Sequence, residues 1–172
     1  YPYQKDSRLV SGSGLVSTDG SNLNNNTKLV HCVIPTTQKA LNGTFDPAAG
    51  LQAGGSKNNG IGLQNVCAFL YFKVKEGCTS ITLEAPDKIS SSHSPNDIWH
   101  LAGDVYLDVH ADGAAIKSFG YSSDTYEPES NSYPSRITMD MSDAQAKDYP
   151  AATYIVAVVP STNTLSDVFI HF

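Results

Sequence analysis

Four side chains near the middle of the chain have the types that bind metals or transfer protons: Asp104, Asp108, His110 and Asp112. Period-two spacing places the first three on one face of an extended strand, with the fourth at its end. Carboxylates in such an arrangement can hold calcium, and the stretch that begins at Asp108 resembles the first half of an EF-hand loop. Position twelve of that loop would be Phe119, where a bidentate glutamate is required. We therefore predict a solvated strand face and no metal site.

The other residues with catalytic potential lack the partners that their chemistry needs. No G-x-S-x-G elbow occurs, and the glycines Gly55, Gly60 and Gly62 are not followed by the Lys-Ser or Lys-Thr of a phosphate loop. The remaining histidines show no spacing that would bring two imidazoles together: His31, His93, His100 and His171. We expect no enzyme and no cofactor. A Ser-His-Asp triad stays an alternative, because its members need not be adjacent in sequence.

Aromatic side chains at a loop rim could form a different kind of site, a platform on which sugar rings stack. The available residues are Trp99, Tyr121, Tyr126 and Tyr133. Trp99 is the only tryptophan, and its apolar neighbours Ile98 and Leu101 favour a packing role for it. The four aromatic residues are therefore candidates for an alternative function, a carbohydrate-binding β-sandwich module of a surface glycan-utilisation system.

Three cysteines, Cys32, Cys67 and Cys78, form no C-x-x-C pair and leave at least one thiol unpaired. Neither a zinc site nor a disulfide framework is indicated, and we expect small buried apolar side chains. If Cys67 and Cys78 lie on strands joined near Gly77, they cannot face each other, which makes a bond between them doubtful.

Composition limits the class of protein. The chain has 172 residues, a 40% apolar fraction and a net charge of −6, which predicts one domain over residues 1–172. Glycine, proline, serine and asparagine are abundant while glutamate occurs only four times, which favours an all-β chain. A pI near 5.1 argues against nucleic acid as a partner. No stretch approaches the ~20 apolar residues of a membrane helix.

Period-two patterns predict a series of short strands. In Val66 to Val74 both alternate sets are apolar, so we expect a central strand buried on both faces, whereas in Ala102 to His110 only Val105, Leu107 and Val109 point inward. The other strands are expected at Arg8–Val10, Leu15–Ser17, Lys28–Ile34, Ser80–Leu83, Ala115–Phe119, Arg136–Met141, Ala152–Val159 and Asp167–Phe172. The expected core consists of Val66, Leu70, Phe72, Val105, Leu107, Val109, Ile155 and Val159.

The segments between these strands carry turn signals. Ile34-Pro35 should end a strand, the Asn22 to Asn26 cluster should form an exposed turn, and Asp112-Gly113 should form a hairpin turn. We further expect one helical turn in Thr36 to Leu41 and a flexible loop in Gly54 to Gly62. Together these signals predict a two-layer antiparallel β-sandwich.

Several phrases, taken in order, resemble the fimbrillin-like proteins of Bacteroides and its relatives. In the first half they are Tyr1-Pro2-Tyr3, Ile34-Pro35-Thr36-Thr37-Gln38 and Gly43-Thr44-Phe45-Asp46-Pro47-Ala48. In the second half they are the strand Val66–Val74, Ile81-Thr82-Leu83-Glu84-Ala85, Leu101-Ala102-Gly103-Asp104-Val105 and the strand Thr153–Pro160. The resemblance covers almost the whole chain.

This resemblance implies a Greek-key, transthyretin-like sandwich in a non-enzymatic fimbrial subunit or adhesin of a type V pilus. Such subunits are exported as lipoproteins, attach to the outer membrane and lie at the cell surface. Other pilus subunits are the expected partners, bound by donor-strand exchange after proteolysis removes an N-terminal strand. Host proteins or glycans are further expected partners. By this comparison, the chain corresponds to the larger part of the N-terminal domain of a two-domain subunit.

Overall fold

The computed structural model describes residues 8–17, 21–54, 56–57, 60–61, 63–74, 78, 80–85, 101–110, 113–122, 136–141, 152–160 and 169–171. Strands and the turns between them make up this part of the chain, and it contains no helix. The predicted all-β class with antiparallel sheets is therefore confirmed. The Greek-key and transthyretin-like topology stays a prediction.

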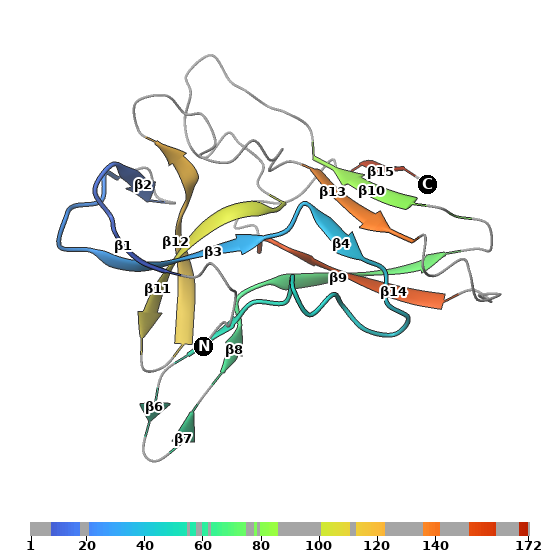
Figure 1. Ribbon diagram of the computed structural model, residues 1–172, viewed down its shortest axis with the longest axis horizontal. Helices are drawn as coiled ribbons and strands as arrows, with labels where there is room; N and C mark the ends of the chain where they lie inside the picture. Colours follow the sequence, from blue (N-terminus) through green and yellow to red (C-terminus); the bar gives the residue numbers. More distant parts are fainter. Residues whose placement is uncertain are drawn as a thin grey trace.

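The largest sheet has five strands in the order β1-β3-β11-β12-β2, and all neighbouring strands in it are antiparallel (Figure 1). Its strands are β1 (Arg8–Ser11), β2 (Leu15–Ser17), β3 (Lys28–Ile34), β11 (Gly103–His110) and β12 (Gly113–Ser122). The predicted β11–β12 hairpin is confirmed, because His110 pairs with Gly113.

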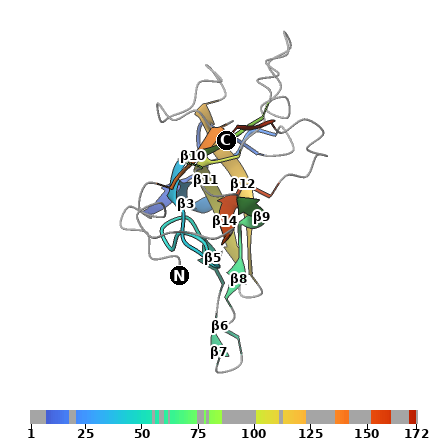
Figure 2. The same cartoon turned by 90° about the vertical axis from the view of Figure 1, so that its right-hand side faces the viewer.

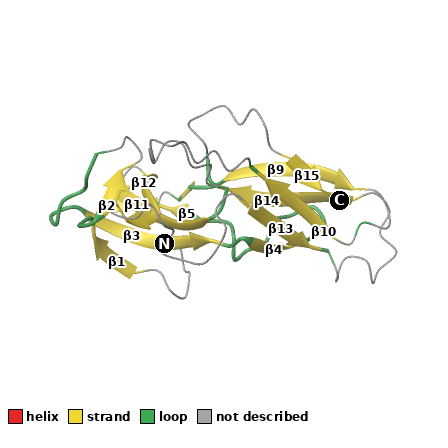
Figure 3. Cartoon of the chain, turned by 90° about the horizontal axis from the view of Figure 1, so that it is seen from above, coloured by secondary structure: helices red, strands yellow, loops and turns green. Residues whose placement is uncertain are grey.

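A four-stranded sheet in the order β15-β10-β13-β4 and a two-stranded sheet of β14 and β9 lie at the other end of the molecule (Figure 3). Their strands are β15 (Phe169–His171), β10 (Ser80–Glu84), β13 (Arg136–Asp140), β4 (Thr37–Lys39), β14 (Ala152–Val158) and β9 (Ala68–Val74). Two small antiparallel pairs complete the fold: β5 (Gln52–Ala53) with β8 (Gln64–Asn65), and β6 (Ser56–Lys57) with β7 (Gly60–Ile61).

Two local predictions are wrong. Thr36 to Leu41 forms no helical turn, because β4 lies there and pairs in parallel with β13. Part of the expected loop Gly54 to Gly62 is ordered as the β6–β7 pair. The prediction at Ile34-Pro35 is confirmed: β3 ends at Ile34, and the chain passes through Pro35 into a different sheet.

The five-stranded sheet is strongly curled. Its outer strands β1 and β2 are separated along the chain only by residues 12–14. In a flat sheet the outer two of five strands would be about 19 Å apart, but the backbone from Ser11 to Leu15 reaches at most about 14 Å. The Leu15 N–H donates to the Gly12 carbonyl at 3.0 Å, which shortens the link further. The two edges of the sheet must therefore approach each other.

The concave side of this curl encloses a small apolar cluster. Leu15, Leu29 and Tyr106 are at most 5% exposed, and Val10 and Leu23 pack against them. Alternation along β11 predicted that Tyr106 would face water, but it is 3% exposed. That prediction is wrong because the curl covers the second face of β11.

The main core lies on the opposite face of the five-stranded sheet. It includes side chains from that sheet, from the four-stranded sheet and from the β14–β9 pair. Its fully buried members include Val105 and Leu107 of β11, Ile81 and Leu83 of β10, Ile137 and Met139 of β13, and Val156 of β14. Four of the eight expected core residues are buried: Val66, Val105, Leu107 and Val159. Leu70, Phe72 and Ile155 are half-buried, and Leu70 and Phe72 pack against this core. Val109 is wrong as a core residue, because it is 36% exposed.

Candidate functional site: the free edge of strand β9

The predicted solvated face of β11 is wrong at Asp104, whose side chain is 9% exposed. Its Oδ1 lies 2.9 Å from His31 Nε2 on β3, and the His31 ring packs on Tyr106 with ring centroids 5.0 Å apart. Asp108 is half-buried. The curl explains these positions, since it turns this face of the sheet inward.

The described residues were compared with the side-chain groups that a metal site or a Ser-His-Asp triad requires. No group of three or more potential ligands occurs there. Asp112 and the side chain of His110 lie outside the described residues. His31 Nδ1 is buried and accepts or donates no hydrogen bond among the described residues, so no serine completes a triad with this His–Asp pair there. The pair joins β3 to β11.

The proposed sugar platform also lies outside the described residues. Trp99, Tyr126 and Tyr133 fall in segments that the structure does not describe, and for Tyr121 only the backbone, within β12, is described. The carbohydrate-binding alternative stays a prediction.

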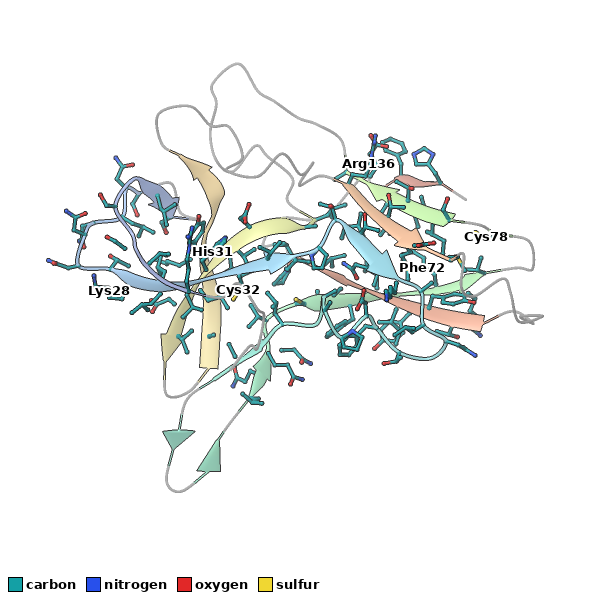
Figure 4. The ribbon with its side chains drawn as sticks, viewed as in Figure 1. Lys28, His31, Cys32, Phe72, Cys78 and Arg136 are labelled. Carbon is teal, nitrogen blue, oxygen red and sulfur yellow. The ribbon has the colours of Figure 1, made fainter. Side chains whose placement is uncertain are left out.

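None of the three cysteines forms a disulfide, and Figure 4 shows Cys32 and Cys78 far apart. Cys32 and Cys67 are buried, as expected, while Cys78 is half-buried. Burial raises the pKa of Cys67 to about 11; a backbone hydrogen bond with Leu51 opposes this shift and nearby Cys32 adds to it. A thiol with such a pKa is almost entirely protonated at neutral pH and is a poor nucleophile.

The most distinctive polar contacts surround strand β14. The buried side chain of Gln38 donates from Nε2 to the Ala157 carbonyl at 2.7 Å and accepts the Ala157 N–H on Oε1 at 3.0 Å. Gln38 thus takes the place of a neighbouring strand at this position. Further along, the Gly43 N–H donates to the Thr153 carbonyl at 2.8 Å. The edge of β14 that faces away from β9 is therefore closed by residues of the first third of the chain.

The segment that closes this edge is held by Asp46, which is 8% exposed. Its Oδ2 accepts the Lys39 N–H and its Oδ1 accepts the Ala48 N–H, each at 2.9 Å. Phe45 packs on Phe69 of β9 with ring centroids 4.7 Å apart. The phrase from Gln38 to Ala48 therefore has a structural role: it attaches this segment to the β14–β9 pair.

The opposite edge of the pair, on β9, has no such cover among the described strands. Ala157 directs its N–H and C=O toward Gln38, away from its cross-strand partner Phe69. In an antiparallel ladder Phe69 must then direct its own N–H and C=O away from β14. The same holds for Tyr71 and Lys73, because outward and inward groups alternate along a strand.

We call this row the free edge of β9: the backbone N–H and C=O groups of Phe69, Tyr71 and Lys73. Figure 2 shows β9 on the outer side of β14, and no described strand pairs with its free edge. The Tyr71 side chain is 68% exposed, whereas Leu70 and Phe72 are half-buried on the core side.

Among the described sheet edges, β9 offers the longest suitable template. The edge strands β4 and β15 have three residues each, against seven in β9. A long, mostly apolar edge strand readily pairs with another chain. Sequence analysis missed this site because it placed β9 at the centre of a sheet. The sequence offered one signal for an edge strand: Tyr71 and Lys73, which both carry polar groups, share one face of it.

Comparison of the chain with protein-family models, with curated proteins and with solved structures finds no match. The described residues include no helix long and apolar enough to span a membrane.

Proposed function

We propose that this chain is a non-enzymatic cell-surface subunit, fimbrial or adhesive, that joins other chains by strand addition at the free edge of β9. The fimbrial and outer-membrane part of the proposal comes from the sequence resemblance to fimbrillin-like proteins. The mode of assembly comes from the structure around β9. Other subunits of the same assembly are the expected partners.

One observation carries the proposal: the two edges of the β14–β9 pair differ in their hydrogen bonding. The β14 edge is satisfied by Gln38 and Gly43, but the β9 edge presents a row of backbone groups that no described residue bonds. In strand addition, such backbone groups supply affinity, and side chains that enter the core at alternate positions set the register. Leu70 and Phe72 line the core side of this edge and are incompletely covered.

A short extended peptide can test whether this edge accepts a strand. The probe is a fluorescent heptapeptide of alternating valine and threonine, titrated with the protein and followed by fluorescence anisotropy. We expect the wild-type chain and Tyr71→Ala to bind it, because both keep the N–H of residue 71. Tyr71→Pro removes that donor without touching a β9–β14 bond, so we expect its affinity to fall at least about tenfold.

Leu70→Pro is the matched control for damage to the fold. Leu70 pairs with Val156, and its N–H points toward β14, so this variant should lose thermal stability where Tyr71→Pro keeps it. The probe is titrated at protein concentrations at which the chain is monomeric, so that a second copy does not occupy the edge. If the wild-type monomer does not bind the probe, or if Tyr71→Pro binds it as well as wild type does, strand addition at this edge is wrong.

A further inference from the structure

The sequence of β9 is complementary to itself when it is reversed about Tyr71. We infer that the strand accepted by the free edge is β9 of a second copy of this chain, antiparallel to the first, with a two-fold axis at Tyr71. The inference rests on the proposed strand addition and names its partner.

The backbone groups fit this arrangement. Tyr71 would pair with the partner's Tyr71, and Phe69 with the partner's Lys73. All of these residues belong to the row whose N–H and C=O groups point outward. Hydrogen-bonded residues lie opposite hydrogen-bonded residues in an antiparallel ladder, so every group of the free edge finds a partner.

The side chains on the outer face of β9 are also compatible with the two-fold pairing. Tyr71 is 68% exposed and would meet the partner's Tyr71, which forms a cross-strand aromatic pair. Lys73 would lie opposite the partner's Phe69, so a cation meets an aromatic ring instead of another cation. A parallel, in-register pair would instead place Lys73 beside the partner's Lys73, and like charges in that position are unfavourable.

The core side of β9 supports the same register. Leu70 would lie opposite the partner's Phe72, and Ala68 opposite the partner's Val74, so all pairs on this side are apolar. A shift by one residue would place outward-directed groups opposite inward-directed ones and turn each side chain to the wrong face. A shift by two residues toward the N-terminus would lose the tyrosine pair and place Lys73 opposite the partner's Cys67.

A charge-complementation experiment tests this geometry, because the two-fold axis places residue 71 against itself. Tyr71→Lys and Tyr71→Glu are prepared separately and examined by sedimentation velocity and native mass spectrometry, together with the wild-type chain. We expect a wild-type dimer, a monomer for each variant alone, and a mixed dimer when the two variants are combined in equal amounts. The dimer dissociation constant of each variant alone should be at least about tenfold higher than that of wild type.

Leu9 provides a matched control, because it is 69% exposed but lies on β1 in a different sheet. Leu9→Lys and Leu9→Glu should both dimerise like the wild-type chain. If the wild-type chain is a monomer that still binds the valine–threonine probe, the two-fold pairing is wrong and strand addition stands. The same conclusion follows if both variants are monomers and their mixture contains no mixed dimer. If the dimer forms and ignores all substitutions at residue 71, it uses another surface, and the inference is wrong.

Discussion

Gln38→Leu should be strongly destabilising, although it replaces a polar buried side chain with an apolar one of similar size. Gln38 is 1% exposed, and its amide satisfies both backbone groups of Ala157, with a further bond of 3.2 Å to the Pro35 carbonyl. The substitution leaves the N–H and C=O of Ala157 buried without partners. Each such group costs about 1–3 kcal/mol.

Burial of the apolar leucine side chain offsets roughly 1–2 kcal/mol of this destabilisation. We therefore expect the free energy of unfolding to fall by about 2.5 kcal/mol, the centre of a range that extends to about 5 kcal/mol, out of a total of about 5–15 kcal/mol for a domain of this kind. Urea denaturation followed by circular dichroism measures this difference, with an unchanged slope as the sign that the unfolded state is unaltered.

Gln52→Leu is the control, because Gln52 is exposed and its amide bonds only the side chain of Asn65 in the contacts described for it. This variant should change the free energy of unfolding by less than about 0.5 kcal/mol. If Gln38→Leu is equally mild, the closure of the β14 edge contributes little to stability, and the argument that contrasts the two edges loses its basis.

Three further predictions concern the core. Leu107→Ala, at a position with 0% exposure, should lower the free energy of unfolding by about 2–5 kcal/mol in the same urea assay; a loss below about 1 kcal/mol would contradict the assigned packing. In native protein at pH 8, iodoacetamide should label Cys78 well before Cys67, because the raised pKa of Cys67 leaves only about a thousandth of it as thiolate there; mass spectrometry of peptides checks the order. Gly50→Ala should lower the melting temperature, because its Cβ would lie 2.1 Å from Cε2 of Phe45; an unchanged melting temperature would show that this ring moves freely.

The strands with one apolar face could be predicted from the sequence. In β10 and β13 the apolar residues Ile81, Leu83, Ile137 and Met139 alternate with polar ones, and all four are fully buried. Strand β4 could not be predicted in this way. Its three residues are polar, and its inward residue is Gln38, whose partner Ala157 lies 119 residues away.

The environment of the candidate site was harder to predict for a similar reason. Periodicity shows which residues of a strand share a face, but it does not show what covers that face. Tyr106 and Asp104 alternate with apolar residues as on a solvated strand, yet the curl buries them. In β9 both alternate sets are apolar, yet Tyr71 is exposed, because the strand lies at an edge.

The distance in sequence between β9 and its partner strand β14 has a consequence for the order of folding during synthesis. Strand β9 leaves the ribosome well before β14, which begins at Ala152, so both edges of β9 lack their final neighbours in the growing chain. Pairings between such distant segments form slowly, and unpaired strand edges on nascent chains favour aggregation. Secretion in an unfolded state, or a chaperone that binds the β9 segment, would protect the nascent chain until its last third is complete.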